Sequence, residues 1–285
     1  MNEKIYTLLR KWYIKTITND LGIVIEEEDK LICYVDKNKF KGSNLCINCS
    51  NFKNKILADR FRLNKKIVYV IDGFDEKYNF IDIESDEDCE VIIKSSTFSG
   101  DVSINAHGNL YIKSVLINDV NSFNLFAESL KVNKLDIMSK KTCECFINAR
   151  SKFELNDSTI ELKKGNVRMV TNNKINVNRS KITGNIVDIA APKSLSFDEN
   201  SFLEAFVKLE LSANDLSEVT IKTPKLVYNA KSFKTMNKSY IFSLKEELNR
   251  QRKNTIEILK EIRGDAINSN LSPEDKIGKL VRKKL

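Results

Sequence analysis

A repeat of about 20 residues constrains the fold more than any other feature of this chain. Three segments fit one eight-residue template with apolar residues at positions one, three and eight, Asn or Asp at position four, and Ser or Asn at position six. They are Phe153 to Ile160 (FELNDSTI), Ile175 to Ile182 (INVNRSKI) and Leu195 to Phe202 (LSFDENSF). Weaker copies begin at Val91, Leu110 and Leu130. A fixed period built on alternating apolar positions is the signature of a solenoid.

A second alternating pattern occurs about halfway through each repeat. Period-two alternation in a strand places the recurring residues inside and the intervening residues outside. The sequence therefore predicts a mainly β fold of about seven to eight coils, and the general preference for right-handed crossovers makes the predicted β-helix right-handed. The second pattern comprises Val102/Ile104/Ala106, Phe123/Leu125/Ala127, Cys145/Ile147/Ala149, Val167/Met169/Thr171, Val187/Ile189/Ala191, Val207/Leu209/Leu211 and Leu226/Tyr228/Ala230.

The two patterns together resemble the right-handed parallel β-helix of pectate-lyase-like proteins over roughly residues 67–235. In that fold, each coil stacks three short strands, and asparagines in the turns form ladders. The resemblance implies a ladder at the fourth template position, which holds Asn133, Asn156, Asn178 and Asp198. The coils are also similar in architecture to those of bactofilins, which are cytosolic β-helical polymers. The resemblance concerns architecture and carries no catalytic motif.

The N-terminal segment, residues 1–66, is expected to cap the solenoid. Apolar residues recur at helical spacing over residues 1–21, which predicts a helix. Two short apolar runs, Ile23 to Ile25 and Leu31 to Val35, flank an acidic turn and predict a hairpin. The rest of the segment is expected to form loops and short strands over the first coil. A solenoid needs a cap because its open end exposes an unpaired strand edge.

The β-helix itself is assigned to residues 67–239, and residues 240–285 are expected to be helical. A heptad-like apolar stripe in this C-terminal segment includes Leu244 and Leu248. Such helices would either cap the end of the solenoid or serve as an oligomerisation element.

Composition favours a protein of the cytoplasm. No secretory signal is recognisable at the N-terminus, and no apolar stretch reaches the 18 residues that would predict a membrane span. The six cysteines are therefore expected to be reduced thiols, and no membrane contact is expected. The heavy use of Lys, Asn and Ile suggests an AT-rich genome, such as that of a bacterium or a phage.

Two cysteines and one histidine are the residues closest to a metal-binding or redox pattern. Cys46 and Cys49 have the spacing of half a zinc site or of a redox pair, and Cys33 is the nearest further ligand. We expect structural thiols instead, with no metal and no cofactor. His107 is the only histidine, so a histidine-based site would need other partners, and we expect a solvent-exposed turn residue.

Charged residues at outward positions are expected to alternate in sign from coil to coil. Such ladders stabilise neighbouring strands by a few tenths of a kcal/mol per pair. A glycosidase needs two acids that converge on a cleft, so the pattern disfavours an enzyme, and no catalytic residue is predicted. The two ladders are Asp157, Arg179 and Glu199, and Arg168, Asp188 and Lys208.

Two phenylalanines and the basic termini are the candidate partner-binding features. Phe126 and Phe146 fall on outward positions of adjacent coils, where a helix of this chain or a partner would cover them. Residues 1–66 hold 14 Lys and Arg against 8 Asp and Glu, and residues 240–285 hold 11 against 7. The densest basic cluster consists of Arg250, Arg252 and Lys253.

These observations favour a non-enzymatic interaction or scaffold protein that binds a protein partner or copies of itself. The first alternative is a carbohydrate-active β-helix enzyme, and the second is a nucleic-acid-associated protein that uses its basic termini. Fold alone does not decide among these functions. The candidate partner-binding residues are Phe126, Phe146, Leu244, Leu248, Arg250, Arg252 and Lys253.

Overall fold

The structure is a computed structural model that describes residues 3–49, 66–75, 78–87, 89–216, 220–222 and 226–233. These residues all belong to one compact unit, residues 1–235. The expected C-terminal helices lie outside the described residues. So do five candidate partner-binding residues, namely Leu244, Leu248, Arg250, Arg252 and Lys253.

The N-terminal segment begins with the predicted helix and hairpin. Helix α1 spans Glu3–Asp20, and strands β1 (Gly22–Glu26) and β2 (Lys30–Val35) pair antiparallel. A short 3₁₀ helix, η1 (Lys37–Lys39), and strand β3 (Asn44–Asn48) follow. β2 and β3 already pair in parallel with strands of the next coil, so the solenoid ladder extends into the segment assigned to the cap.

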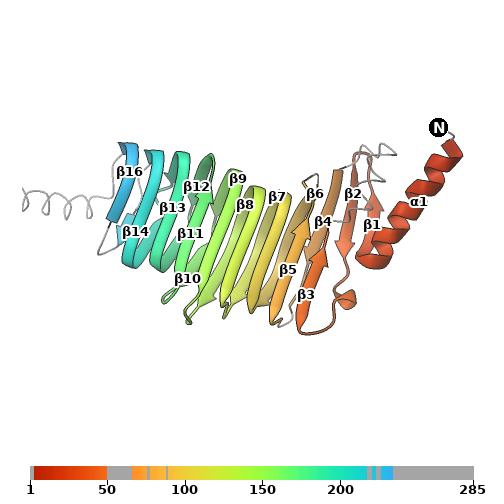
Figure 1. Cartoon of the computed structure of the whole chain (residues 1–285), viewed down its shortest axis with the longest axis horizontal. Helices are drawn as coiled ribbons and strands as arrows, with labels where there is room; N and C mark the ends of the chain where they lie inside the picture. Colours follow the sequence, from red (N-terminus) through yellow and green to blue (C-terminus); the bar gives the residue numbers. More distant parts are fainter. Residues whose placement is uncertain are drawn as a thin grey trace, which may run out of the picture. The chain divides into compact units, whose positions relative to one another are not determined.

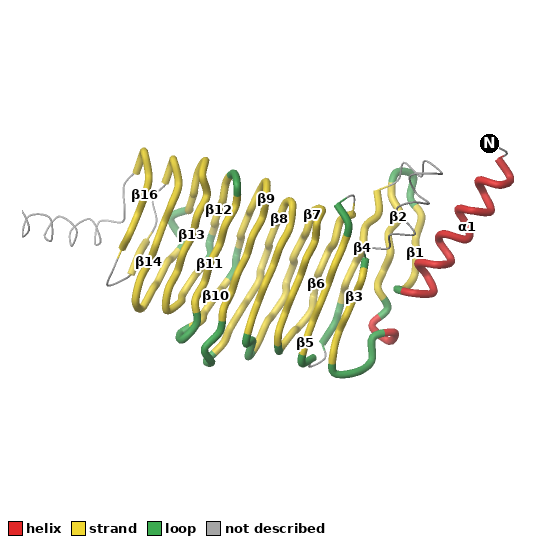
Figure 2. Tube along the Cα trace, viewed as in Figure 1, coloured by secondary structure: helices red, strands yellow, loops and turns green. Residues whose placement is uncertain are grey.

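The remaining strands form a parallel β-solenoid of about seven turns, as the repeat predicts. Figures 1 and 2 show the strands lying side by side along one stack, with loops at its edges. The strands are β4 (Lys66–Asp72), β5 (Phe80–Ser85), β6 (Cys89–Ser99), β7 (Asp101–Asn118), β8 (Ser122–Ser139), β9 (Glu144–Asn156), β10 (Thr159–Leu162), β11 (Asn166–Thr171), β12 (Lys174–Asn178), β13 (Lys181–Phe197), β14 (Phe202–Leu216), β15 (Thr220–Lys222) and β16 (Leu226–Phe233).

The template residues at positions four to six form a stacked turn. Asn178 Nδ2 donates to Asn156 Oδ1 over 2.8 Å, which confirms the expected asparagine ladder for this pair. The next residue of each coil adopts a left-handed backbone, with φ of 50° at Asp157 and 46° at Arg179. This conformation redirects the chain so that the following serine points inward. The template therefore encodes a ladder residue, a left-handed turn residue and a buried serine.

The buried serines form a second ladder beneath the first. The Ser158 amide donates to Ser180 Oγ over 3.1 Å, and the Ser180 hydroxyl donates to the Asn178 carbonyl oxygen over 2.7 Å. The Leu135 amide donates to Ser158 Oγ in the same way over 3.0 Å. These bonds satisfy backbone groups that the turn would otherwise leave buried without a partner.

The interior of the coils contains the two predicted apolar tracks. Phe123 and Phe153, one from each track, are fully buried, as are the small residues Ala127 and Ala149. Burying one large apolar side chain contributes roughly 1.5–3 kcal/mol, so successive coils hold together mainly through this core.

The register differs from the predicted one in the last coils. A bulge after Gly184 aligns Val187 with Leu209, whereas the repeat predicts alignment with Val207. Val207 is consequently 51% exposed rather than inward. One extra residue in the preceding turn also places Leu203 inside, where the template predicts Phe202.

Helix α1 packs against β1 at the N-terminal end of the stack (Figure 1). Ile17 and the following Leu21 are buried. Arg10 forms an ion pair with Glu26 of β1, and Lys39 Nζ donates to the carbonyl oxygens of Thr18 and Asn19 at the helix C-terminus. A cation at this end also interacts favourably with the helix dipole. No helix among the described residues has the length and apolar character needed to cross a membrane.

Candidate functional site

Phe126 and Phe146 lie on the same outer face of the solenoid, as predicted. They come from neighbouring strands, β8 and β9, and each alternates with buried residues. In register, Phe126 lies opposite Asn148 and Phe146 lies opposite Asn124, so the two rings are diagonal neighbours. Both side chains are half-buried. Diagonal neighbours on paired strands are within reach of aromatic side chains.

Cationic and imidazole groups surround Phe126. The Arg150 guanidinium carbon lies 5.0 Å from the centre of the Phe126 ring, which is cation–π geometry. The His107 ring meets the same phenylalanine edge-on, with 5.8 Å between ring centres. His107 lies at a corner of β7 and is half-buried, whereas the sequence analysis expects a solvent-exposed turn residue.

Phe146 is covered in the same manner by Arg168. The guanidinium carbon lies 5.9 Å from the centre of the ring, and Arg168 Nε lies 3.2 Å from Asp188 Oδ2 in the next coil. The predicted third member of this ladder, Lys208, is wrong because the extra residue in the turn before Phe202 and the bulge after Gly184 together move the register by two residues. The residue opposite Asp188 is Glu210. Burial raises the pKa of Asp188, with a further contribution from Glu210, while Arg168 and Lys208 lower it.

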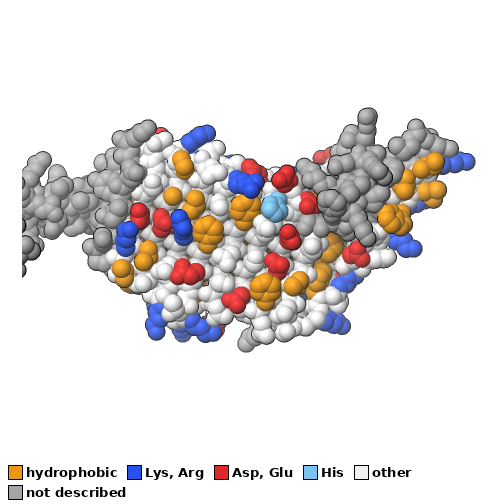
Figure 3. Space-filling model, in the orientation of Figure 1, with side chains coloured by type: hydrophobic (Ala, Val, Ile, Leu, Met, Phe, Trp, Pro, Cys, Tyr) orange, Lys and Arg blue, Asp and Glu red, His pale blue; other side chains and the backbone are white. Residues whose placement is uncertain are grey.

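We define the aromatic face as His107, Phe126, Phe146, Arg150 and Arg168. Its rings are half-buried, and a guanidinium group lies over each phenylalanine ring. Aromatic and arginine side chains dominate the binding energy of protein interfaces. On the face drawn in Figure 3, hydrophobic side chains lie in small groups among basic and acidic ones. The arrangement is suited to contact with another macromolecule through apolar area and charge together.

His107 and Arg150 were not predicted from the sequence as parts of this site. Each directly follows the small inward residue that precedes a corner of its strand, Ala106 and Ala149 respectively. Phe126 lies in the coil between them. A corner residue in each of the two coils that flank the coil of Phe126 was therefore the sequence signal for these two residues.

Carboxylates on other outer positions are paired with cations. Arg179 Nε and Nη2 donate to the two carboxylate oxygens of Asp157 over 2.6 and 2.8 Å, which confirms the first pair of the predicted ladder. The hydrogen bond from Arg179 lowers the pKa of Asp157. On its other side, Arg179 donates its backbone N–H to Asp198 Oδ1 over 2.8 Å.

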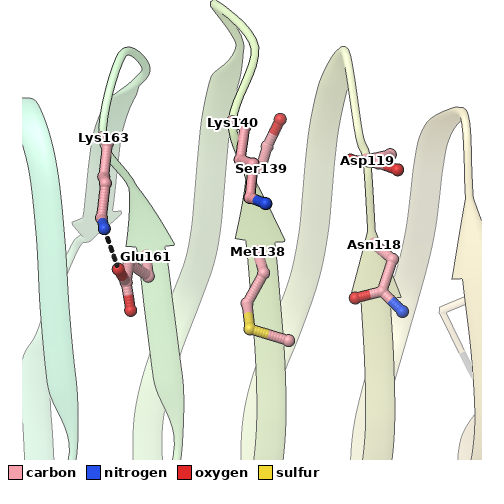
Figure 4. A pocket seen from close by; sticks show the side chains of 7 residues that line it. All are labelled: Asn118, Asp119, Met138, Ser139, Lys140, Glu161 and Lys163. Atoms are coloured by element: carbon pink, nitrogen blue, oxygen red, sulfur yellow. Dashed lines mark ion pairs between the residues drawn. The ribbon is translucent and has the colours of Figure 1, made fainter.

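A cavity of about 470 Å³ lies on a different side of the coils. It is lined by residues from β7, β8 and β10 and the adjoining turns (Figure 4). Its acid Glu161 is neutralised by Lys163 at 3.3 Å and Lys181 at 3.9 Å. Met138 supplies the exposed apolar part of the lining. The cavity thus combines the apolar side chain of Met138 with two acids, Asp119 and Glu161, of which Glu161 is paired with lysines.

The cysteines do not assemble the zinc half-site that the CxxC spacing resembles. Cys46 is exposed on β3, whereas Cys49 is buried, so the two side chains occupy different environments. Burial, together with the nearby Cys33 and Cys89 thiols, raises the pKa of Cys49. No group of three potential metal ligands occurs among the residues that the structure describes. The five buried cysteines therefore act as small apolar core residues.

Comparison with known proteins adds no name to this fold. No protein-family model, no curated protein and no solved structure matches the chain. The resemblance to parallel β-helices is therefore one of architecture.

Proposed function

We propose that this protein is a non-enzymatic interaction scaffold whose solenoid binds a protein partner, including a second copy of the chain, through the aromatic face. The observation that carries the proposal is the placement of two phenylalanines, each stacked with an arginine, on the outside of adjacent coils. Large apolar rings at such positions gain free energy when a partner removes them from water.

The charge pattern along this face supports a second copy as one partner. Arg150 and Arg168 are followed in the next coils by Asp188 and Glu210. A copy related by a two-fold axis that crosses the solenoid near Arg168 would bring its acids over the coils of Arg150 and Phe126. Its phenylalanines would lie over Asp188 and Glu210 of the first copy. Two-fold interfaces require such self-complementary surfaces.

The alternative functions receive less support from the described residues. Asp157, Glu161 and Asp188 are each paired with Arg or Lys, which is unlike the unpaired acids of a carbohydrate-cleaving site. The basic cluster that favours nucleic acid lies outside the described residues. We place the scaffold in the cytoplasm, a proposal that the six free cysteines support.

The double variant Phe126→Ser/Phe146→Ser tests the proposal. We expect the wild-type chain to self-associate in light scattering over a concentration series and the variant to be monomeric. Tyr111→Ser is the matched control, because Tyr111 is also an exposed aromatic residue with a cation, Lys131, 5.8 Å from its ring centre, but lies on another face. Far-UV circular dichroism of each variant verifies that the solenoid is folded.

Two results would contradict the proposal for self-association. One is a wild-type chain that stays monomeric at every concentration, and the other is a folded double variant with the wild-type mass. A further variant, Leu244→Ser/Leu248→Ser, locates the contact. Loss of association in this variant alone would assign assembly to the C-terminal segment instead of the aromatic face.

A further inference from the structure

Helix α1 exposes a row of apolar side chains. Ile5, Leu8 and Trp12 are 49%, 67% and 53% exposed, whereas Ile17, on the opposite side of the helix, is 2% exposed. At 3.6 residues per turn, the three exposed side chains fall within an arc of about 60°. Hydrophobic side chains are visible over α1 in Figure 3, next to basic ones.

The exposed apolar side chains of the described residues are concentrated at this end of the protein. Eleven large apolar residues are exposed, and six of them lie in the first 35 residues. Besides the row on α1, they include Ile23 and Ile25 of β1 and Tyr34 of β2. Isolated exposed apolar residues are ordinary, but a concentration on one element indicates a binding surface.

A row of lysines borders the apolar row on one side. Lys11 and Lys15 are exposed, and helical spacing places them, with Lys4, within about 40° of one another and directly beside Leu8. Asp20 falls on the other side of the apolar row at the same spacing. The helix therefore presents apolar and positive surface together between Lys4 and Lys15.

We propose that α1 binds the surface of an anionic phospholipid bilayer, lying in the plane of the interface. Ile5, Leu8 and Trp12 enter the boundary between headgroups and acyl chains, and Lys11 and Lys15 reach the lipid phosphates. An amphipathic helix with lysines bordering its apolar side has the chemistry of an interfacial helix, and tryptophan prefers this depth. Lysine stems lie along the apolar layer while their ammonium groups stay at phosphate level.

The same charges disfavour other occupants of this surface. Two α1 helices packed face to face in antiparallel orientation would bring their lysine rows to the same edge, and like charges repel. Nucleic acid would satisfy the lysines but offers no apolar layer for Leu8 and Ile5. An anionic bilayer satisfies both, and each lysine near such a surface strengthens binding roughly fivefold.

The full chain carries its own reporter, because Trp12 is its only tryptophan. The experiment titrates the chain with vesicles of phosphatidylcholine and phosphatidylserine at a ratio of 70 to 30, and with vesicles of phosphatidylcholine alone. With the anionic vesicles, we expect a blue shift of the emission, quenching by brominated lipid, and co-sedimentation that weakens as salt is added. With the neutral vesicles, we expect binding at least tenfold weaker.

Two variants separate the apolar and electrostatic contributions. Leu8→Glu removes the centre of the apolar row, and Lys11→Glu/Lys15→Glu reverses the lysine row. We expect each to lower partitioning into anionic vesicles at least tenfold. Lys140→Glu/Lys141→Glu makes the same charge change at exposed positions of a solenoid turn and should bind like the wild type. All of these side chains are exposed, and circular dichroism verifies folding.

Three outcomes would overturn the proposal. An unchanged Trp12 spectrum with anionic vesicles would show that α1 does not enter the interface. Binding by the two α1 variants at the level of the control would assign membrane contact to another segment. Tighter binding to polyglutamate or duplex DNA than to the anionic vesicles would identify an acidic macromolecule as the partner.

Discussion

The ladder of buried serines allows the energetics of the coil to be tested with one atom. Ser180 is 2% exposed, and its Oγ accepts the Ser158 amide and donates to the Asn178 carbonyl oxygen. Ser180→Ala deletes both bonds and leaves the buried Ser158 amide unpaired, whereas the Asn178 carbonyl oxygen still accepts the Asp157 amide over 3.0 Å. An unpaired buried group costs about 1–3 kcal/mol. We therefore expect a net loss of about 1–3 kcal/mol in the free energy of unfolding.

Urea denaturation followed by circular dichroism measures this loss. Ser103→Ala is the control, since Ser103 is half-buried at an outward position of β7. We expect the midpoint of Ser180→Ala to fall with an unchanged slope, and that of the control to stay near the wild type. Solenoid coils contact mainly their neighbours, so the Ser158 amide should also exchange its hydrogen faster.

A small effect would refute this account of the turn. If Ser180→Ala and Ser103→Ala both lower the free energy of unfolding by less than about 0.5 kcal/mol, the buried backbone groups are satisfied in another way. A bound water would be the simplest replacement. The serine of the repeat would then serve as a small residue for tight turns, and its hydroxyl would contribute little.

Three further predictions concern the cysteines and Asp188. Of the six free cysteines only Cys46 is exposed, so a thiol reagent at pH 8 should label one thiol in the native protein and six in denaturant; labelling of a second thiol at the same rate would contradict the burial. Burial raises the pKa of the Cys33 thiol to about 12 from 9.0, so the folded state favours the protonated thiol. This contribution to the free energy of unfolding is lost as the pH rises from 9.0 towards 12, and the urea midpoint should fall over that range. In an NMR titration, Glu210→Gln should lower the pKa of Asp188, and Lys208→Gln should raise it by a smaller amount. A larger shift with Lys208→Gln would instead favour the register predicted from the repeat, in which Lys208 lies opposite Asp188.

The repeat predicted the architecture because the same chemical roles recur in every coil. Each role needs particular side chains. The roles are an inward apolar pair, an asparagine that hydrogen-bonds to the next asparagine, a residue with a left-handed backbone and a buried serine. Phe153, Asn156 and Ser158 fill these roles in one coil, and their counterparts return in the next. A pattern supported by several independent requirements tolerates exceptions at single positions.

Register in the last coils could not be predicted from alternation alone. Two overlapping apolar sets fit the alternation equally well, Val207/Leu209/Leu211 and Leu209/Leu211/Ala213. The structure places the second set inside. A slip of one residue would exchange the two faces and violate the pattern, but a slip of two leaves it intact. The bulge after Gly184 has no signature in the repeat itself.

The aromatic face was predicted in part for the same reason. Phe126 and Phe146 lie within regular strands, where alternation decides which side chains point outward. His107 and Arg150 lie at corners, and the register shifts there, between Ala106 and Asn109 and between Ala127 and Ser129. Counting residues from the repeat therefore fails to align the corner side chains with the rings that they contact.

The two proposed surfaces are separable and would reinforce each other. The exposed row of α1 contributes nothing to the core, so Leu8→Glu should leave the mass in solution unchanged. Likewise, Phe126→Ser/Phe146→Ser should leave the Trp12 shift on vesicles unchanged. A bilayer that holds many copies by α1 raises their effective concentration, and an interface of modest affinity then becomes populated without any new contact. A scaffold assembled at a membrane surface should show two results together. The two sets of substitutions should act independently in solution, and the wild type should associate more strongly on anionic vesicles than in solution.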